Sequence, residues 1–296
     1  MKALLRTFAA LLALSLAGGA HAQLNLNKLF DTVKKATDTA KNASDASREF
    51  TQDEEIALGE GICASFLGAA PLLENDSAQQ YVNRVGRWLA SQTERPDLPW
   101  TFGVLDTETI NAFALPGGTV FISSGLLRRL HNESELAGVL AHEIAHVVRK
   151  HQLNAIQANA GASVFQSIGE SVAGDRLARS RVGSTGLSNQ IASSGVALVK
   201  DGIFLRPLDR SLEFEADRAG VVIAARAGYD PYGLVSVLQT LQAQKGDDGG
   251  GMSLFKTHPP PAERIAELER MGPSVLDRYA SQPQLETRFR QTLSAK

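Results

Sequence analysis

The segment His142-Glu143-Ile144-Ala145-His146 decides how the rest of the chain is interpreted. Its surroundings are rich in apolar residues at helical spacing, so we expect a helix here. At 3.6 residues per turn, the two histidines project from one helix face, one turn apart. A single zinc ion can accept a nitrogen from each ring. Glu143 lies at the edge of that face, where it can reach a metal-bound water without binding the metal itself.

A second pattern supports the first, because the HExxH spacing alone also arises by chance. Glu213 and Asp217 lie one turn apart on a later predicted helix, whereas Glu215 points to nearly the opposite side. Thermolysin-like zinc sites use this ExxxD spacing, in which the Glu binds the metal and the Asp orients a ligand histidine. We therefore expect Glu213 to be the third ligand and Asp217 to lie behind His142. Glu215 has the simpler interpretation of an exposed pair with Arg218.

These residues predict one zinc ion per chain, held by His142, His146 and Glu213, with a fourth position left for water. The metal would lower the pKa of that water to near neutral. Glu143 would act as the catalytic base and later return a proton to a departing amine. The expected reaction is hydrolysis of a peptide bond.

His258 has three interpretations that the sequence leaves open. It is a candidate fourth ligand that plugs the zinc, a candidate oxyanion partner, or a cap for the helix that follows Pro261. His131 and His151 are expected at the surface or at helix ends.

The remaining pattern predicts an α+β fold, mainly helical, with a small β-sheet beside the HExxH helix. Asn132 is the expected N-cap of that helix, with Glu135 completing a capping box. The predicted strands cover residues 100–105, 111–115 and 119–123, and further helices cover residues 53–67, 78–91, 209–227 and 261–271. Residues 161–205 are rich in Gly, Ser and Ala, and whether they form a lid is left open.

The N-terminus has the features of an export signal. A short basic leader precedes an apolar stretch from Phe8 to Ala17, and Ala20-His21-Ala22 offers a cleavage site after Ala22. An uncleaved anchor is the alternative. No other apolar run reaches membrane-spanning length, so we expect a periplasmic mature chain without a transmembrane anchor, with peripheral membrane association left open. The net charge of −2, from 30 basic and 32 acidic residues, gives no reason to expect nucleic acid as a partner.

Several stretches, in this order, resemble the HtpX-like and CAAX-prenyl-protease-like zinc metalloendopeptidases, particularly their smaller exported bacterial members. The matching stretches are Asp53 to Gly59, Asn111 to Gly118, Ser124 to Leu127, His142 to His146, Glu213 to Asp217 with Gly220, and Thr257 to Pro260. The export signal, the helical spacing after it and the extent of the resemblance together give the following expected divisions: signal peptide 1–22, helical leader 23–50, zinc metallopeptidase domain 51–271 and C-terminal helical tail 272–296.

The resemblance implies that an edge strand near the zinc pairs with an extended substrate. Residues 119–123 are one candidate for this strand, and the other consists of Asn111, Ala112, Phe113 and Ala114. The implied substrates are misfolded or stalled proteins of the cell envelope, with outer-membrane proteins as one class. Two alternatives stay open: an envelope chaperone or assembly factor with a latent or plugged zinc site, and a zinc hydrolase that does not act on proteins.

Overall fold

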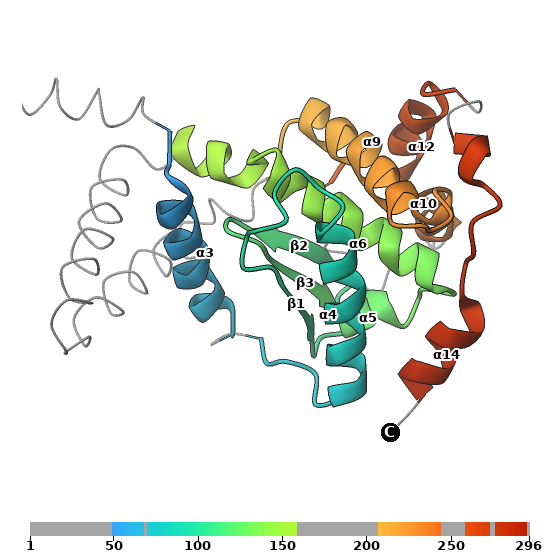
Figure 1. The fold of residues 1–296 in the computed structure, drawn as a ribbon, viewed down its shortest axis with the longest axis horizontal. Helices are drawn as coiled ribbons and strands as arrows, with labels where there is room; N and C mark the ends of the chain where they lie inside the picture. Colours follow the sequence, from blue (N-terminus) through green and yellow to red (C-terminus); the bar gives the residue numbers. More distant parts are fainter. Residues whose placement is uncertain (1–48, 68–69, 159–206, 244–257, 273–275, 295–296) are drawn as a thin grey trace, which may run out of the picture. The chain divides into compact units, whose positions relative to one another are not determined.

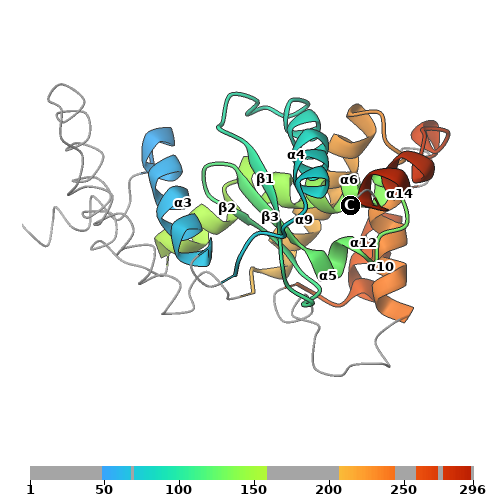
Figure 2. The ribbon, with the colours of Figure 1, turned by 90° about the horizontal axis from the view of Figure 1, so that it is seen from below.

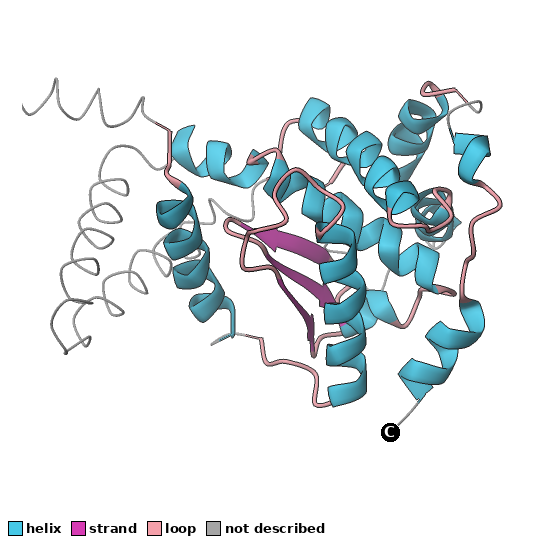
Figure 3. Ribbon diagram, in the orientation of Figure 1, coloured by secondary structure: helices cyan, strands magenta, loops and turns pink. Residues whose placement is uncertain are grey.

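The computed structural model describes residues 49–67, 70–158, 207–243, 258–272 and 276–294. All of them belong to the second of two compact units, Asp45–Lys296. The predicted signal peptide, most of the helical leader and the 161–205 stretch lie outside the described residues. The described part is mainly helical around a small sheet, as Figure 3 shows, and this confirms the predicted α+β class.

The described residues contain one three-stranded sheet with the order β1-β3-β2 (Figure 1). β1 (Thr101–Leu105) runs parallel to β3 (Thr119–Ser123), and β2 (Ala112–Leu115) runs antiparallel to β3. A tight turn joins β2 to β3, and Gly117 and Gly118 take the positive φ values of 81° and 104° that it requires. The predicted strands are therefore correct to within one residue at their starts.

The two faces of the sheet pack against different helices, following the period-two alternation of a strand. One face, which includes Phe102, Val120 and Ile122, joins the main core with α4 (Asp76–Ala90) and α6 (Glu133–Val148). The other face, which includes Phe121, packs against α3 (Gln52–Leu67) and the helical residues 151–158. Figure 2 shows α3 and α4 on opposite sides of the strands.

Side chains of α4 occupy the outer edge of β1. The Gln79 amide donates to the Val104 carbonyl at 2.9 Å, and its oxygen accepts from the Val104 nitrogen at 2.8 Å. The Asn83 amide donates to the carbonyl of Phe102 at 3.3 Å. The N–H and carbonyl of Val104 and the carbonyl of Phe102 are thus bonded within the chain.

A buried ion pair fixes α3 (Gln52–Leu67) against the β2–β3 turn. Arg95 donates to both oxygens of Glu55, at 3.0 and 2.7 Å, and Gly117 donates its backbone N–H to the same carboxylate at 3.2 Å. Gly59 faces the turn so closely that a Cβ there would lie 1.8 Å from the carbonyl oxygen of Pro116. Only a glycine permits this approach, which explains the glycine in the predicted helix.

The site-bearing part of the chain is a group of helices around α6. The remaining elements are α5 (Ser124–Leu127), α9 (Arg210–Arg226), α10 (Gly233–Ala243), α12 (Pro261–Glu269), the 3₁₀ helix η3 (Asp277–Tyr279) and α14 (Glu286–Ser294). The residues of α6 from Glu133 to Val147 are all buried, so this helix is central rather than half-exposed. Across the described residues, no helix combines the length and apolar character needed to cross a membrane.

The caps of the two site helices follow the sequence, with one difference. The Asn132 side chain accepts from the Glu135 nitrogen at 2.9 Å, and the Asp209 side chain accepts from the Ser211 nitrogen at 2.9 Å. The Glu135 carboxylate, however, accepts from the backbone nitrogen of His131 at 2.6 Å and not from that of Asn132. The second hydrogen bond of the predicted capping box is therefore made to the residue before the N-cap and not to the N-cap itself.

A buried carboxylate at the start of α6 holds four elements together. Glu133 accepts from the hydroxyls of Tyr81 at 2.5 Å and Tyr229 at 2.7 Å, and from Arg288 Nε at 2.6 Å. Burial alone would raise the pKa of Glu133, but these hydrogen bonds outweigh it and hold the pKa below its ordinary value. The charged form is thus the one that stabilises the fold.

We expect Glu133→Gln to lower the free energy of unfolding by about 2–3 kcal/mol at pH 7, because the bonds to the carboxylate lose their charge. A lowered folded pKa gives stability that is present above the unfolded pKa and lost as the pH falls towards the folded one. The difference between variant and wild type should therefore shrink below about pH 4. Urea unfolding at several pH values measures this difference in the free energy of unfolding. Glu286→Gln, which removes an exposed pair with Arg290, is the control; equal losses in both variants would contradict this role of Glu133.

Candidate metal centre

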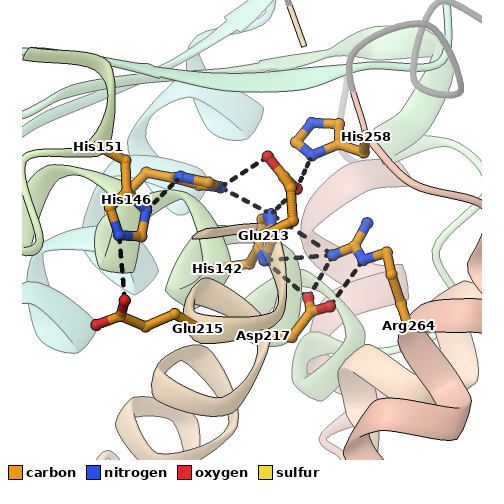
Figure 4. A network of polar contacts seen from close by, with 8 residues as sticks. All are labelled: His142, His146, His151, Glu213, Glu215, Asp217, His258 and Arg264. Atoms are coloured by element: carbon orange, nitrogen blue, oxygen red, sulfur yellow. Dashed lines mark hydrogen bonds and ion pairs between the residues drawn. The ribbon is translucent and has the colours of Figure 1, made fainter. Parts of the chain in front are cut away.

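The structure brings together four side chains that could hold a metal ion, from three segments of the chain. His142 and His146 come from α6, Glu213 comes from α9, and His258 precedes α12. Their donor atoms all lie within 4.8 Å of one another (Figure 4). His142, His146 and Glu213 are buried, and His258 is nearly so.

The helix pair α6 and α9 sets this geometry. Gly220 on α9 lies against His142, and a Cβ there would be 2.9 Å from the His142 backbone nitrogen. The two helices can therefore cross closely, one turn after Asp217 and two turns after Glu213. The facing side chains meet at short range for this reason.

The donor set fits a cation. The Nε2 atoms of His142 and His146 are 3.2 Å apart, and each lies 3.6 Å from an oxygen of Glu213. Zinc–nitrogen distances of about 2.0–2.1 Å in a tetrahedral shell place neighbouring donors about 3.3 Å apart. Two facing imidazole lone pairs have no proton to share in their neutral forms, so a positive ion between them and the carboxylate satisfies all three groups.

A carboxylate and an arginine lie behind His142. Its Nδ1 is 2.9 Å from an oxygen of Asp217, and Arg264 donates to both oxygens of Asp217, at 2.9 and 2.5 Å. Burial and the charge of Arg264 lower the pKa of His142, but Asp217 and Glu213 outweigh them and raise it to about 9. The site thus attracts positive charge to the ring, and a bound metal ion supplies that charge in place of a proton.

Glu143 stands next to the donor set and has a different environment. Burial raises its pKa, and one of its oxygens has no hydrogen-bond partner within the described residues. A cavity of about 20 Å³ is lined by His142, Glu143, Ala112 and His258, among others. That space holds about one water molecule. A larger cavity of about 840 Å³ between α3, α4 and β1 contains none of the donors. The site is therefore identified by its donor groups and not by the size of its cavity.

His258 does not cap a helix. Its Nδ1 lies 2.5 Å from Glu213 Oε2, and the N-cap of α12 is Pro260, which has no side-chain bond. The side chain of His131 is 56% exposed and pairs with Glu135, which agrees with the prediction that His131 lies at the surface.

The surroundings differ from the expectations in two ways. His151 lies at a helix end, as expected, because the helical segment 151–158 begins there, but its side chain is only 3% exposed and touches His146. Glu215 does not pair with Arg218, which instead donates to Glu267 at 2.8 Å; Glu215 faces Arg149 at 3.4 Å. Both differences arise because the sequence pattern does not show how neighbouring helices meet.

Arg264 is a site residue that the sequence analysis missed. Its only local signal is its place in a helix of mixed charge, where a solvated arginine is the ordinary expectation. Its side chain is 4% exposed, and its partner Asp217 is fully buried.

We expect Arg264→Met to lower the free energy of unfolding of the zinc-loaded protein by about 3–5 kcal/mol, because Asp217 keeps a buried charge without its partner. The double variant with Asp217→Asn should recover part of this loss. Arg210→Met removes an exposed pair with Glu263 and should cost less than about 1 kcal/mol. Urea unfolding compares them, and an Arg264→Met loss no larger than that of Arg210→Met would contradict the assignment.

Comparison with known proteins agrees with this geometry. The model of peptidase family M48 matches residues 76–272. The beta-barrel assembly-enhancing protease of Yersinia pestis is 32% identical over 218 residues, which are 73% of this chain and 43% of that protein. Its counterpart in Escherichia coli (strain K12) is 30% identical over 230 residues, 75% of this chain and 45% of that protein.

A eukaryotic protein also matches the chain. The mitochondrial metalloendopeptidase OMA1 of Schizosaccharomyces pombe is 32% identical over 195 residues, 66% of this chain and 53% of that protein. The matched part spans about half the length of these relatives. The predicted resemblance to HtpX-like zinc metalloendopeptidases is thereby confirmed at the level of the family. Since the family model covers more than half of the sequence, the chain belongs to peptidase family M48.

Proposed function

We propose that this chain is a zinc-dependent endopeptidase of the cell envelope. One observation carries the proposal: two histidine Nε2 atoms and the Glu213 carboxylate converge in a buried site beside Glu143, in a chain of peptidase family M48. His142, His146 and Glu213 would hold one zinc ion, and Asp217 would fix the ring of His142.

The proposed chemistry uses the environment of Glu143. Zinc held by His142, His146 and Glu213 would supply Lewis-acid chemistry, which polarises a carbonyl and lowers the pKa of water to near neutral. The free oxygen of Glu143 accepts the proton of the attacking water and then returns it to the departing amine. Burial raises the pKa of Glu143, which suits a group that must both take and release a proton near neutral pH.

β2 is the better of the two candidate substrate strands. The Ser123 nitrogen donates to the Asn111 carbonyl at 2.9 Å. Because backbone direction alternates along the strand, the N–H and C=O of Phe113 also point towards β3, and those of Ala112 and Ala114 point away from it. β3 is paired on both sides, whereas β2 is an edge. Ala112 also lines the cavity beside Glu143. An extended peptide added to this edge would therefore lie next to the catalytic base.

We assign His258 to the resting site as a fourth, displaceable donor. His258 belongs to the same donor cluster as His142 and His146, and the contact of its Nδ1 with Glu213 directs the ring towards the site. A fourth protein donor closes a zinc site, and its departure opens the position that catalysis requires.

The proposed location and substrates follow from the export signal and from the relatives. Cleavage after Ala22 would release the chain into the periplasm. Two relatives carry the name beta-barrel assembly-enhancing protease, which supports misfolded or stalled outer-membrane proteins as the substrate class. Recognition through backbone pairing suits such substrates because it does not depend on side chains.

We expect Glu143→Gln to abolish hydrolysis of an unfolded test protein while one zinc per chain is retained, because Glu143 moves protons and does not bind the metal. A loss of at least about 100-fold is the size expected for a general base. Peptide release and metal content are measured on the same preparation, with Glu286→Gln as the control. Wild-type turnover by Glu143→Gln would overturn the mechanism, and a zinc-loaded wild type without proteolysis would favour a chaperone.

We expect His258→Ala to weaken zinc binding several-fold and to leave hydrolysis intact or raise it, since a competing donor is removed. Chelator competition and initial rates measure the two effects. A fall in turnover at unchanged zinc affinity would instead make His258 an oxyanion partner.

A further inference from the structure

A third histidine on the α6 side of the site does not belong to the donor cluster. His151 Nδ1 lies 3.0 Å from Nδ1 of His146, and the two rings meet edge-on at 76° with centroids 5.1 Å apart (Figure 4). Its Nε2 lies 3.7 Å from Glu215 on α9. The imidazole therefore lies between a donor residue and a carboxylate.

The backbone takes an unusual conformation to place His151 there. In an uninterrupted helix, residues five apart point about 140° away from each other, so His151 could not touch His146. α6 instead ends at Val148, and Lys150 adopts a φ of 56°, which residues other than glycine rarely take. A new helical segment then starts at residue 151 and turns the His151 ring back towards His146.

The protons of the two rings can be assigned from the contacts. His146 directs Nε2 towards the donor cluster, so its proton sits on Nδ1 when Nε2 binds a metal. The 3.0 Å contact is a hydrogen bond only if His146 Nδ1–H donates and the lone pair on His151 Nδ1 accepts. The proton of His151 then sits on Nε2, on the side of Glu215.

We propose that His151 is a positioning residue that fixes the tautomer and the ring orientation of His146 and thereby raises the zinc affinity of the site. The inference rests on the proposed zinc site. It gives the two ligand histidines different supports: Asp217 with Arg264 behind His142, and a second imidazole behind His146. Loss of such a partner lowers metal affinity by about 10- to 100-fold in proteins.

Two variants separate positioning from packing. His151→Asn keeps an acceptor atom near the position of Nδ1, whereas His151→Leu keeps the volume without an acceptor. We expect His151→Leu to weaken zinc binding by about 10- to 100-fold and His151→Asn to restore it to within a few-fold of wild type. Zinc affinity is measured by chelator competition, and the absorption spectrum of the cobalt-loaded protein reports the ligand geometry. His131→Leu, at an exposed histidine, should change neither.

Equal zinc affinity in His151→Leu and wild type would overturn the proposal, as would equal weakening in the Asn and Leu variants at equal circular dichroism. If His151→Leu does not fold, the shift of the cobalt spectrum in His151→Asn relative to wild type decides: an unchanged spectrum with retained affinity supports the proposal, and an altered one overturns it. The readout does not require turnover, so a zinc-binding protein without proteolysis would contradict the proposed function and leave this inference standing.

Discussion

The close crossing of α6 and α9 at Gly220 is the constraint on which the site depends. The backbone of His142 occupies the space that a side chain at position 220 would need. Because the helices approach to this distance, a pair of histidines on one helix meets a pair of carboxylates on the other. The surrounding core, with α6 buried along its length, keeps the two helices from sliding apart.

This arrangement concentrates charge where water is scarce. Glu143, Glu213 and Asp217 are all buried at the same site, and Arg264 is a buried cation that faces Asp217. Buried like charges are costly unless they are paired or coordinate a metal. The excess of carboxylates over cations explains why His142 attracts a proton or a metal ion so strongly. The affinity for a cation is therefore built into the fold and does not depend on the ligands alone.

The sequence was informative wherever the relevant physics is local. Strand alternation and glycine turns placed β1, β2 and β3 to within one residue, and helix periodicity distinguished Glu213 from Glu215 because the two point to different sides. His151 and Arg264 were missed for one shared reason. The first depends on a left-handed residue at Lys150, and the second on the docking of α12 against α9. Neither event leaves a periodic pattern in the chain.

The side chains of Gln79 and Asn83 along the edge of β1 have a consequence for how this protein meets other polypeptides. A sheet with two open edges would offer unfolded chains two sites of strand addition, and would also let copies of the protein join into a continuous sheet. With one edge closed by α4, the described sheet can accept a strand only beside β2. A polypeptide that paired with this sheet through its backbone would therefore lie beside β2, next to the cavity that Ala112 and Glu143 line.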